Sequence, residues 1–313
     1  MRFRPGRCGI SLLLILICAP TLFAGWEQTI TAGARGDFPD ASHLQVSYVF
    51  GWSELPAATA TIRLSKLPEG RLQLDGNAET IGLVRTLWKF DVHHQAIADG
   101  ATLRPIEMQQ VENVRSKTIT THLVFNNQGV ARTRSDSKSQ KPAKTKRFNF
   151  PSLFDLHSAL LYLRSQPLEN GNVQRIVVYP ATDAYLATVT VTGRENITVN
   201  AGSYKAIKLD LQLSKVGKDK KLEPHKKFKR ATAWVSDDAD RLLLRIEAHV
   251  FIGTVFAELQ SVRFSGKINE SIQGREASRL THSIGHHLAR ERRVIALESA
   301  RWRTDSRYVL PRQ

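Results

Sequence analysis

The chain has 313 residues, of which 42% are hydrophobic and 24% are charged. This balance is typical of a folded globular protein and excludes a largely disordered chain, and the length allows one large domain or two small ones. With 45 Lys or Arg against 29 Asp or Glu, the formal net charge of +16 favours anionic partners.

The first 24 residues have the pattern of a secretory signal peptide. Three arginines precede an apolar run over residues 12–19, and the small residues Ala24 and Gly25 stand at the expected cleavage point. The run is much shorter than the roughly 20 residues that a helix needs to cross a bilayer, so we expect no transmembrane span in the mature chain. These features predict export, with the periplasm of a Gram-negative bacterium as the location.

Export narrows the choice of partners and of stabilising bonds. The anions available outside the cytoplasm are lipid head groups, lipopolysaccharide and acidic polymers rather than nucleic acid. Both cysteines, Cys8 and Cys18, lie in the predicted signal, so the mature chain would be stabilised by its core without disulfides. We expect a polar lead over residues 25–41, one β domain over 42–265 and a basic tail, helical or partly disordered, over 266–313.

Alternation of apolar and polar residues predicts most of the β domain. In residues 84–92, Val84, Thr86, Trp88 and Phe90 share one face of a predicted strand. The same alternation appears in residues 119–125 and 207–213, and further strands are expected at 59–64, 71–74, 175–179, 185–192, 232–235, 242–251 and 254–259. The predicted fold is mainly β: a strongly curved antiparallel sheet or a partly open barrel, with one covering helix and a C-terminal helical tail.

The covering helix is expected over residues 153–164. Ser152 stands where an N-cap is expected, and Asp155 lies near the positive end of the helix dipole. One side of the helix carries an apolar stripe, made of Leu156, Ala159, Leu160 and Leu163. The stripe predicts packing against a face of the sheet.

Two lysine-rich stretches lie between predicted strands. Residues 131–147 contain seven basic residues and one Asp, and residues 215–230 contain eight basic residues and two acidic ones. Both have the composition of solvated loops. The cations that end the second stretch are the candidate anion-binding residues: Lys226, Lys227, Lys229 and Arg230.

The sequence predicts no catalytic residue and no cofactor. Asp155, His157 and Ser158 are the residue types of a hydrolase triad. On one helix, however, adjacent side chains point about 100° apart, so His157 cannot act as the base for Ser158. Asp155 and Ser158 are more consistent with a role at the start of the helix, and Arg164 with either the negative end of the helix or a buried carbonyl or carboxylate.

The histidines predict no metal site. His93 and His94 are adjacent on a predicted strand and therefore face opposite sides. His282 and His286 are four residues apart, as zinc ligands on a helix are, but Ser283 stands where zinc hydrolases have Glu and no third ligand is evident.

The aromatic residues of the predicted strands allow two interpretations. Packing in a filled core is the ordinary one. The alternative is a lining for an acyl chain, because a strongly curved sheet closed by a helix can enclose a cavity. Alternation does not distinguish a filled interior from a hollow one.

Three segments of the second half carry a recognisable pattern: residues 154–164 with Asp155, Ser158 and Arg164, residues 191–195, and residues 233–238 followed by Gly253. The first resembles the helix, and the other two resemble the later strands, of the DUF3108 family of exported bacterial proteins. The resemblance covers roughly residues 42–262. It implies a curved antiparallel sheet and an envelope location, and it supplies no activity and no catalytic residues.

Together these features favour a non-enzymatic envelope module that binds or assembles an anionic component such as a lipid or lipopolysaccharide. Two alternatives stay open: an envelope hydrolase with catalytic residues dispersed along the sequence, and a scaffold that recruits another envelope protein through the C-terminal helix.

Overall fold

The computed structural model describes residues 25–31, 33–37, 43–217, 219–224, 230–250 and 253–265. The predicted signal peptide and basic tail lie outside these residues. The described residues form two 3-10 helices, η1 (Trp26–Thr29) and η2 (Pro68–Gly70), and two α-helices, α1 (Gly82–Leu87) and α2 (Leu156–Ser165). The strands are β1 (His43–Trp52), β2 (Leu55–Lys66), β3 (Arg71–Thr80), β4 (Phe90–Asp99), β5 (Pro105–Val114), β6 (Lys117–Asn126), β7 (Gly129–Asp136), β8 (Lys144–Asn149), β9 (Leu153–Phe154), β10 (Val173–Val178), β11 (Ala184–Val199), β12 (Gly202–Val216), β13 (Leu222–Pro224), β14 (Arg230–Ser236), β15 (Leu243–His249) and β16 (Thr254–Ser265).

All the strands belong to one sheet, in the order β8-β7-β6-β5-β4-β3-β2-β1-β16-β15-β14-β12-β11-β10-β9, with β13 beside β12. Every neighbouring pair is antiparallel except β9 and β10, which are parallel. The sheet does not close, because β8 and β9 end the order without pairing to each other. The structure thus confirms the predicted fold class of a strongly curved, mainly antiparallel sheet.

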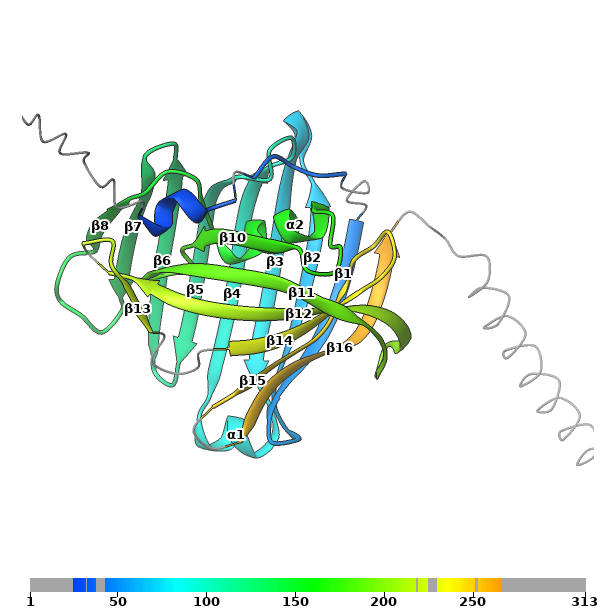
Figure 1. Cartoon of the computed structure of the whole chain (residues 1–313). Coiled ribbons are helices and arrows are strands. Elements are labelled where there is room, and N and C mark those ends of the chain that lie inside the picture. The colour runs from blue at the N-terminus through cyan, green and yellow to red at the C-terminus, as the bar shows by residue number, and fades with distance from the viewer. Residues whose placement is uncertain are drawn as a thin grey trace, which may run out of the picture.

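The sheet folds over on itself (Figure 1). Strands β2–β8 form one layer and β10–β15 form a second layer that crosses in front of it, with β1 and β16 at the bend. The main core lies between the layers, where Leu74, Met108 and Leu123 of the first layer join a cluster with Leu186 and Leu244 of the second. Helix α2 lies between the two layers, beside β10.

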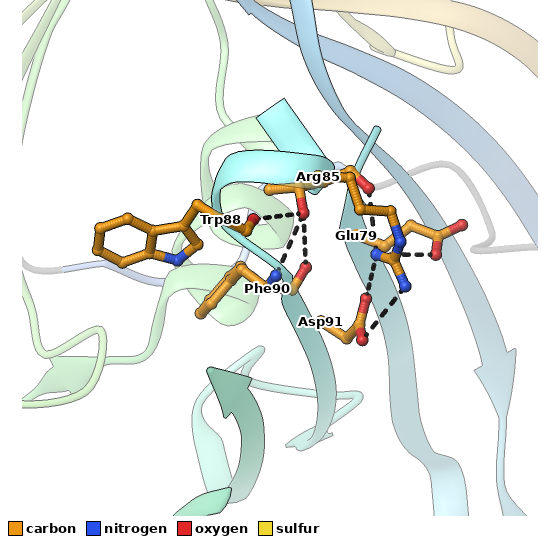
Figure 2. Close-up of polar contacts among 6 residues, drawn as sticks. Glu79, Arg85, Trp88, Phe90 and Asp91 are labelled. Atoms are coloured by element: carbon orange, nitrogen blue, oxygen red, sulfur yellow. Dashed lines mark hydrogen bonds and ion pairs between the residues drawn. The ribbon is translucent and has the colours of Figure 1, made fainter. Parts of the chain in front are cut away.

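One predicted strand is wrong. Residues 84–92 were expected to be a single strand, but residues 82–87 form α1 and only Phe90 onward belongs to β4. Gly82 has a φ of +54°, which ends the extended backbone of β3. The Thr80 hydroxyl then accepts a hydrogen bond from the Phe90 backbone N–H at 3.2 Å, which joins the end of β3 to the start of β4 after the helix (Figure 2).

The covering helix starts later than predicted. Ser152 is not its N-cap, because that residue has a φ of +60° and the next two residues form β9 beside β10. Asp155 caps the helix instead: its side chain accepts hydrogen bonds from the backbone N–H groups of His157 and Ser158. The apolar stripe is also only partly covered by the sheet, since Leu156 is exposed.

Candidate ligand-binding cavity

A cavity of about 400 Å³ lies between helix α2 and the second layer of the sheet. Its walls come from α2 and from strands β1, β10, β11, β12, β14, β15 and β16. The described lining contains no charged side chain. A space of this size and character suits an apolar ligand, since binding pockets usually measure about 300–1,000 Å³ and have mostly apolar walls.

Small side chains keep this space open. Five alanines line the cavity: Ala159, Ala187, Ala231, Ala248 and Ala257. All five are buried. Ala231 lies directly opposite Ala248 across β14 and β15, so two large residues that could fill the middle of the wall are absent. Apolar and polar residues alternate in these strands as they do in strands that border a filled core. The space stays hollow because several of the inward-facing residues are small alanines.

A second cavity of about 160 Å³ lies on the other side of α2. Both cavities are lined by Leu160 and Leu163 of α2 and by Leu211 and Ile246 of the sheet. The helix stripe that was predicted to pack against the sheet therefore forms a shared apolar wall. Charged side chains line only the smaller of these two cavities, which has Arg164 and Arg241 together with Tyr48 and His157, whereas the one polar side chain in the lining of the larger cavity is Tyr185.

The larger cavity opens to solvent at one end. Phe50, Leu156 and Val255 line it and are also exposed, although each has a large apolar side chain. Exposed apolar residues at a cavity mouth are typical of an entrance for an apolar ligand.

The start of α2 is held by a buried capping box. Oδ1 of Asp155 accepts the backbone N–H of His157 at 2.6 Å and that of Ser158 at 3.0 Å, and the Ser158 hydroxyl accepts the backbone N–H of Asp155 at 3.1 Å. Burial raises the pKa of the Asp155 carboxyl to about 6. Its other oxygen, Oδ2, has no hydrogen-bond partner among the described atoms. Both residues thus have a structural role in the helix.

Two histidines, the buried His157 and the half-buried His94, tie α2 to the first layer. Nδ1 of His94 lies 3.3 Å from Nε2 of His157, and the rings meet edge to face. Burial lowers the pKa of each imidazole to about 4, so both are neutral near pH 7. His93 turns to the opposite face and bonds to Asn77, as adjacent strand residues must. The His94–His157 contact escaped the sequence analysis, because only the tertiary fold brings these two residues together.

The far end of α2 is fixed by Arg164. Its Nε and Nη2 donate to the backbone carbonyl of Asp240 at 3.2 and 2.6 Å. Burial lowers the pKa of Arg164. The sequence allowed a carbonyl or a carboxylate as the partner of Arg164, and the structure shows that a backbone carbonyl is one of its partners. Arg241, on the same loop, donates to the carbonyl of Gln166 just after the helix at 3.0 Å.

Of the candidate anion-binding residues, the structure describes one. Arg230 begins β14 and its Nε lies 2.7 Å from Oδ1 of Asp210. Lys226, Lys227 and Lys229 lie outside the described residues, as do His282 and His286. Within the described chain, no three residues of the metal-ligating types gather into a cluster.

The model of a family described as "Protein of unknown function (DUF3108)" matches residues 45–260. The chain belongs to the DUF3108 family. The match agrees with the resemblance of the helix and later strands, and it contains α2 and every residue that lines the larger cavity. A search of curated protein sequences gave no match.

Three solved structures align with most of this DUF3108 protein. A β-barrel-like protein of the family DUF1849 from Brucella abortus is 7% identical with a TM-score of 0.51, and the alignment covers 72% of this chain and 98% of that one. A candidate lipoprotein from Parabacteroides distasonis is 8% identical with a TM-score of 0.31 and coverages of 74% and 99%. A protein with a YmcC-like fold from Bacteroides fragilis is 10% identical with a TM-score of 0.27 and coverages of 74% and 100%. Only the first supports an argument, and it shows the fold alone. None of the described helices is long and apolar enough to cross a membrane.

Proposed function

We propose that this DUF3108 protein is a non-enzymatic module of the bacterial envelope that binds the acyl chain of an amphiphile in the cavity beside α2. The observation that carries the proposal is the uncharged lining of the larger cavity, held open by five buried alanines. An engineered cavity of about 150 Å³ already binds benzene, so about 400 Å³ has room for a longer hydrocarbon.

The affinity expected for an acyl chain in this cavity is in the range that suits a carrier protein. Each buried methylene contributes about 0.8 kcal/mol, and roughly ten of them would contribute about 8 kcal/mol. This corresponds to a dissociation constant near 1 μM before the costs of ordering the ligand. Micromolar binding holds a ligand and still allows its release.

The envelope location and the anionic head group are further parts of the proposal. The location is supported by the pattern of the first 24 residues and by the family resemblance. An anionic head group is supported by the net charge of +16, and we assign its contact to Lys226, Lys227, Lys229 and Arg230. Contact between these cations and anionic head groups predicts that binding to anionic vesicles weakens as the salt concentration rises, because exposed charges more than about 10 Å apart are largely screened at 0.1 M salt.

The hydrolase and the scaffold, the two alternative functions, fit the described geometry less well. In a hydrolase the Ser158 hydroxyl would need a base, but it exchanges hydrogen bonds with the backbone of Asp155, while the His157 ring faces His94. A scaffold would need no hollow interior.

Mass spectrometry of an organic extract tests the proposal. Exported protein purified without detergent should yield an acyl-chain amphiphile in near-stoichiometric amount, and addition of a long-chain fatty acid should displace it. An extract free of lipid, from protein that also binds no added fatty acid, would favour the scaffold.

A further inference from the structure

One end of the molecule exposes large apolar side chains at high density. Helix α1 and the residue after it expose Leu83, Leu87 and Trp88, and the β1–β2 hairpin exposes Trp52 and Leu55. We call these five residues the apolar tip. Leu83 is 75% exposed, Leu87 70% and Leu55 66%. The two elements adjoin, since the backbone of Ile81 donates to the carbonyl of Ala57 at 2.9 Å. Figure 1 places α1 beside the ends of β1 and β2.

The tip continues the wall of the larger cavity. Residues that face one another across neighbouring strands lie on one face of the sheet. The register leads from Leu211 to Ala231, Ala248 and Val255, all of which line the cavity, then to Trp52 and finally to Leu55. An unbroken apolar row thus runs from inside the cavity, past its mouth, to the tip.

Polar contacts hold α1 so that its apolar side chains face outward. The Arg85 guanidinium lies 2.6 Å from Asp91 and 3.5 Å from Glu79, and it also donates to the carbonyl of Thr80 at 3.1 Å (Figure 2). The Thr80 hydroxyl donates to the carbonyl of Trp88 at 3.0 Å. The charge of Arg85 is therefore neutralised by two carboxylates. These contacts hold α1 in place against the sheet, with Leu83 and Leu87 exposed.

Two further cations border the tip. The Arg115 guanidinium lies 5.6 Å from the centre of the Trp88 ring, and Lys89 follows Trp88 directly. Both side chains are exposed. Tryptophan and leucine beside exposed Lys and Arg suit the boundary between acyl chains and phosphate head groups.

From this arrangement we propose that the apolar tip docks on the surface of a lipid bilayer, so that an acyl chain passes along the apolar row into the cavity. This inference rests on the proposed function. The partner is lipid because the tip joins an apolar cavity and its cations match the charge of phosphate groups.

Vesicle flotation tests the docking. The variant combines Leu83→Ser, Leu87→Ser and Trp88→Ser, and its control combines Val124→Ser and Val173→Ser, two exposed apolar residues elsewhere on the sheet. The probes are phosphatidylcholine vesicles with and without one-quarter phosphatidylglycerol. Wild type and control should float with both, more strongly with the anionic lipid, and the tip variant should bind at least tenfold more weakly. Equal flotation of the tip variant would overturn the proposal.

A second measurement separates this proposal from the proposed function. Binding of a short, water-soluble fatty acid needs no membrane, so the tip variant should keep wild-type affinity for it. If wild type floats but binds no fatty acid, the acyl-chain function fails while the docking stands. Brominated lipids should quench the tryptophan fluorescence of wild type, which tests docking without any variant. A dimer of wild type that the tip variant loses, without lipid quenching, would show that the tip binds a second copy and would contradict docking.

Discussion

Nε2 of His157 lies 3.3 Å from Nδ1 of His94, and this contact joins helix α2 to strand β4 across the interior of the fold. A neutral imidazole has one N–H, so one ring donates and the other accepts. If both rings were protonated to imidazolium, both facing nitrogens would carry a proton, the bond would be lost and two positive charges would lie side by side. Because α2 lines both cavities, its anchoring to β4 affects the shape of the binding site.

The histidine pair predicts a stability that depends on pH. The pKa of each ring falls from 6.5 in the unfolded chain to about 4 in the fold, so between these values the unfolded chain binds more protons and stability rises with pH. Asp155 opposes this trend, because its pKa rises from 3.8 to about 6 and the folded chain keeps that proton. From about pH 4 to 6 the net difference is one proton, or about 1.4 kcal/mol per pH unit.

Asp155→Asn should make this dependence steeper. Asn keeps the N-cap but does not titrate, so the slope should approach two protons, while His157→Gln should flatten it. Urea unfolding at four pH values measures the slopes. Thr198→Ala, which changes no titratable group and removes an exposed contact with Ser203, is the control and should leave the slope as in wild type. Identical slopes for the wild type and all three variants would contradict the role of the pair.

The capping box predicts a modest structural cost and no catalytic one. Ser158→Ala removes the hydrogen bond to the buried N–H of Asp155 and should lower the free energy of unfolding by about 1 kcal/mol. Thr198→Ala, which removes an exposed contact with Ser203, should cost less than about 0.5 kcal/mol. Denaturant midpoints compare the two. A turnover that Ser158→Ala abolishes without unfolding the protein would restore the hydrolase interpretation.

The edge of the sheet contains pairs of like charge. Arg134 lies opposite Lys144 and Arg132 opposite Lys146 in the β7–β8 hairpin. Like charges directly opposite are destabilising, so Lys144→Glu should stabilise the protein by about 0.2–1 kcal/mol. Lys141→Glu makes the same change of charge in the preceding loop and should have a smaller effect. Equal shifts in the melting temperature would mean that net charge, rather than the cross-strand pair, decides. Lysines on an edge strand also disfavour pairing of that edge with other chains.

Strands with one wet face were predictable from sequence, and those with special backbone geometry were not. Residues 119–125 and 207–213 lie within β6 and β12, because a regular alternation matches a half-buried strand. Residues 84–92 alternate equally well, but the positive φ of Gly82 turns the chain into a helix first. The start of α2 was displaced for the same kind of reason, since Ser152 also has a positive φ.

The site was only partly predictable. A curved sheet with a covering helix suggested a cavity, and the stripe of Leu160 and Leu163 does line one. Whether the interior is hollow depends on which inward-facing residues lie opposite one another on neighbouring strands. Ala231 lies opposite Ala248 because of the strand register, which the hydropathy pattern does not reveal. The basic segment before Trp234 suggested the anion contact, and for Lys226, Lys227, Lys229 and Arg230 this stays a prediction.

The central claim is that the cavity beside α2 binds an acyl chain, and titration of a fluorescent long-chain fatty acid into Ala231→Phe tests it most directly. The phenylalanine would occupy the middle of the larger cavity, whereas Ala131→Phe adds the same volume at a partly exposed position of β7 that lines neither cavity beside α2. We predict micromolar, saturable binding by wild type and Ala131→Phe, at least tenfold weaker binding by Ala231→Phe, and a melting temperature for Ala231→Phe no lower than that of wild type, because a hollow is filled rather than overpacked. Wild-type affinity in a folded Ala231→Phe variant, or no saturable binding by wild type, would contradict the account.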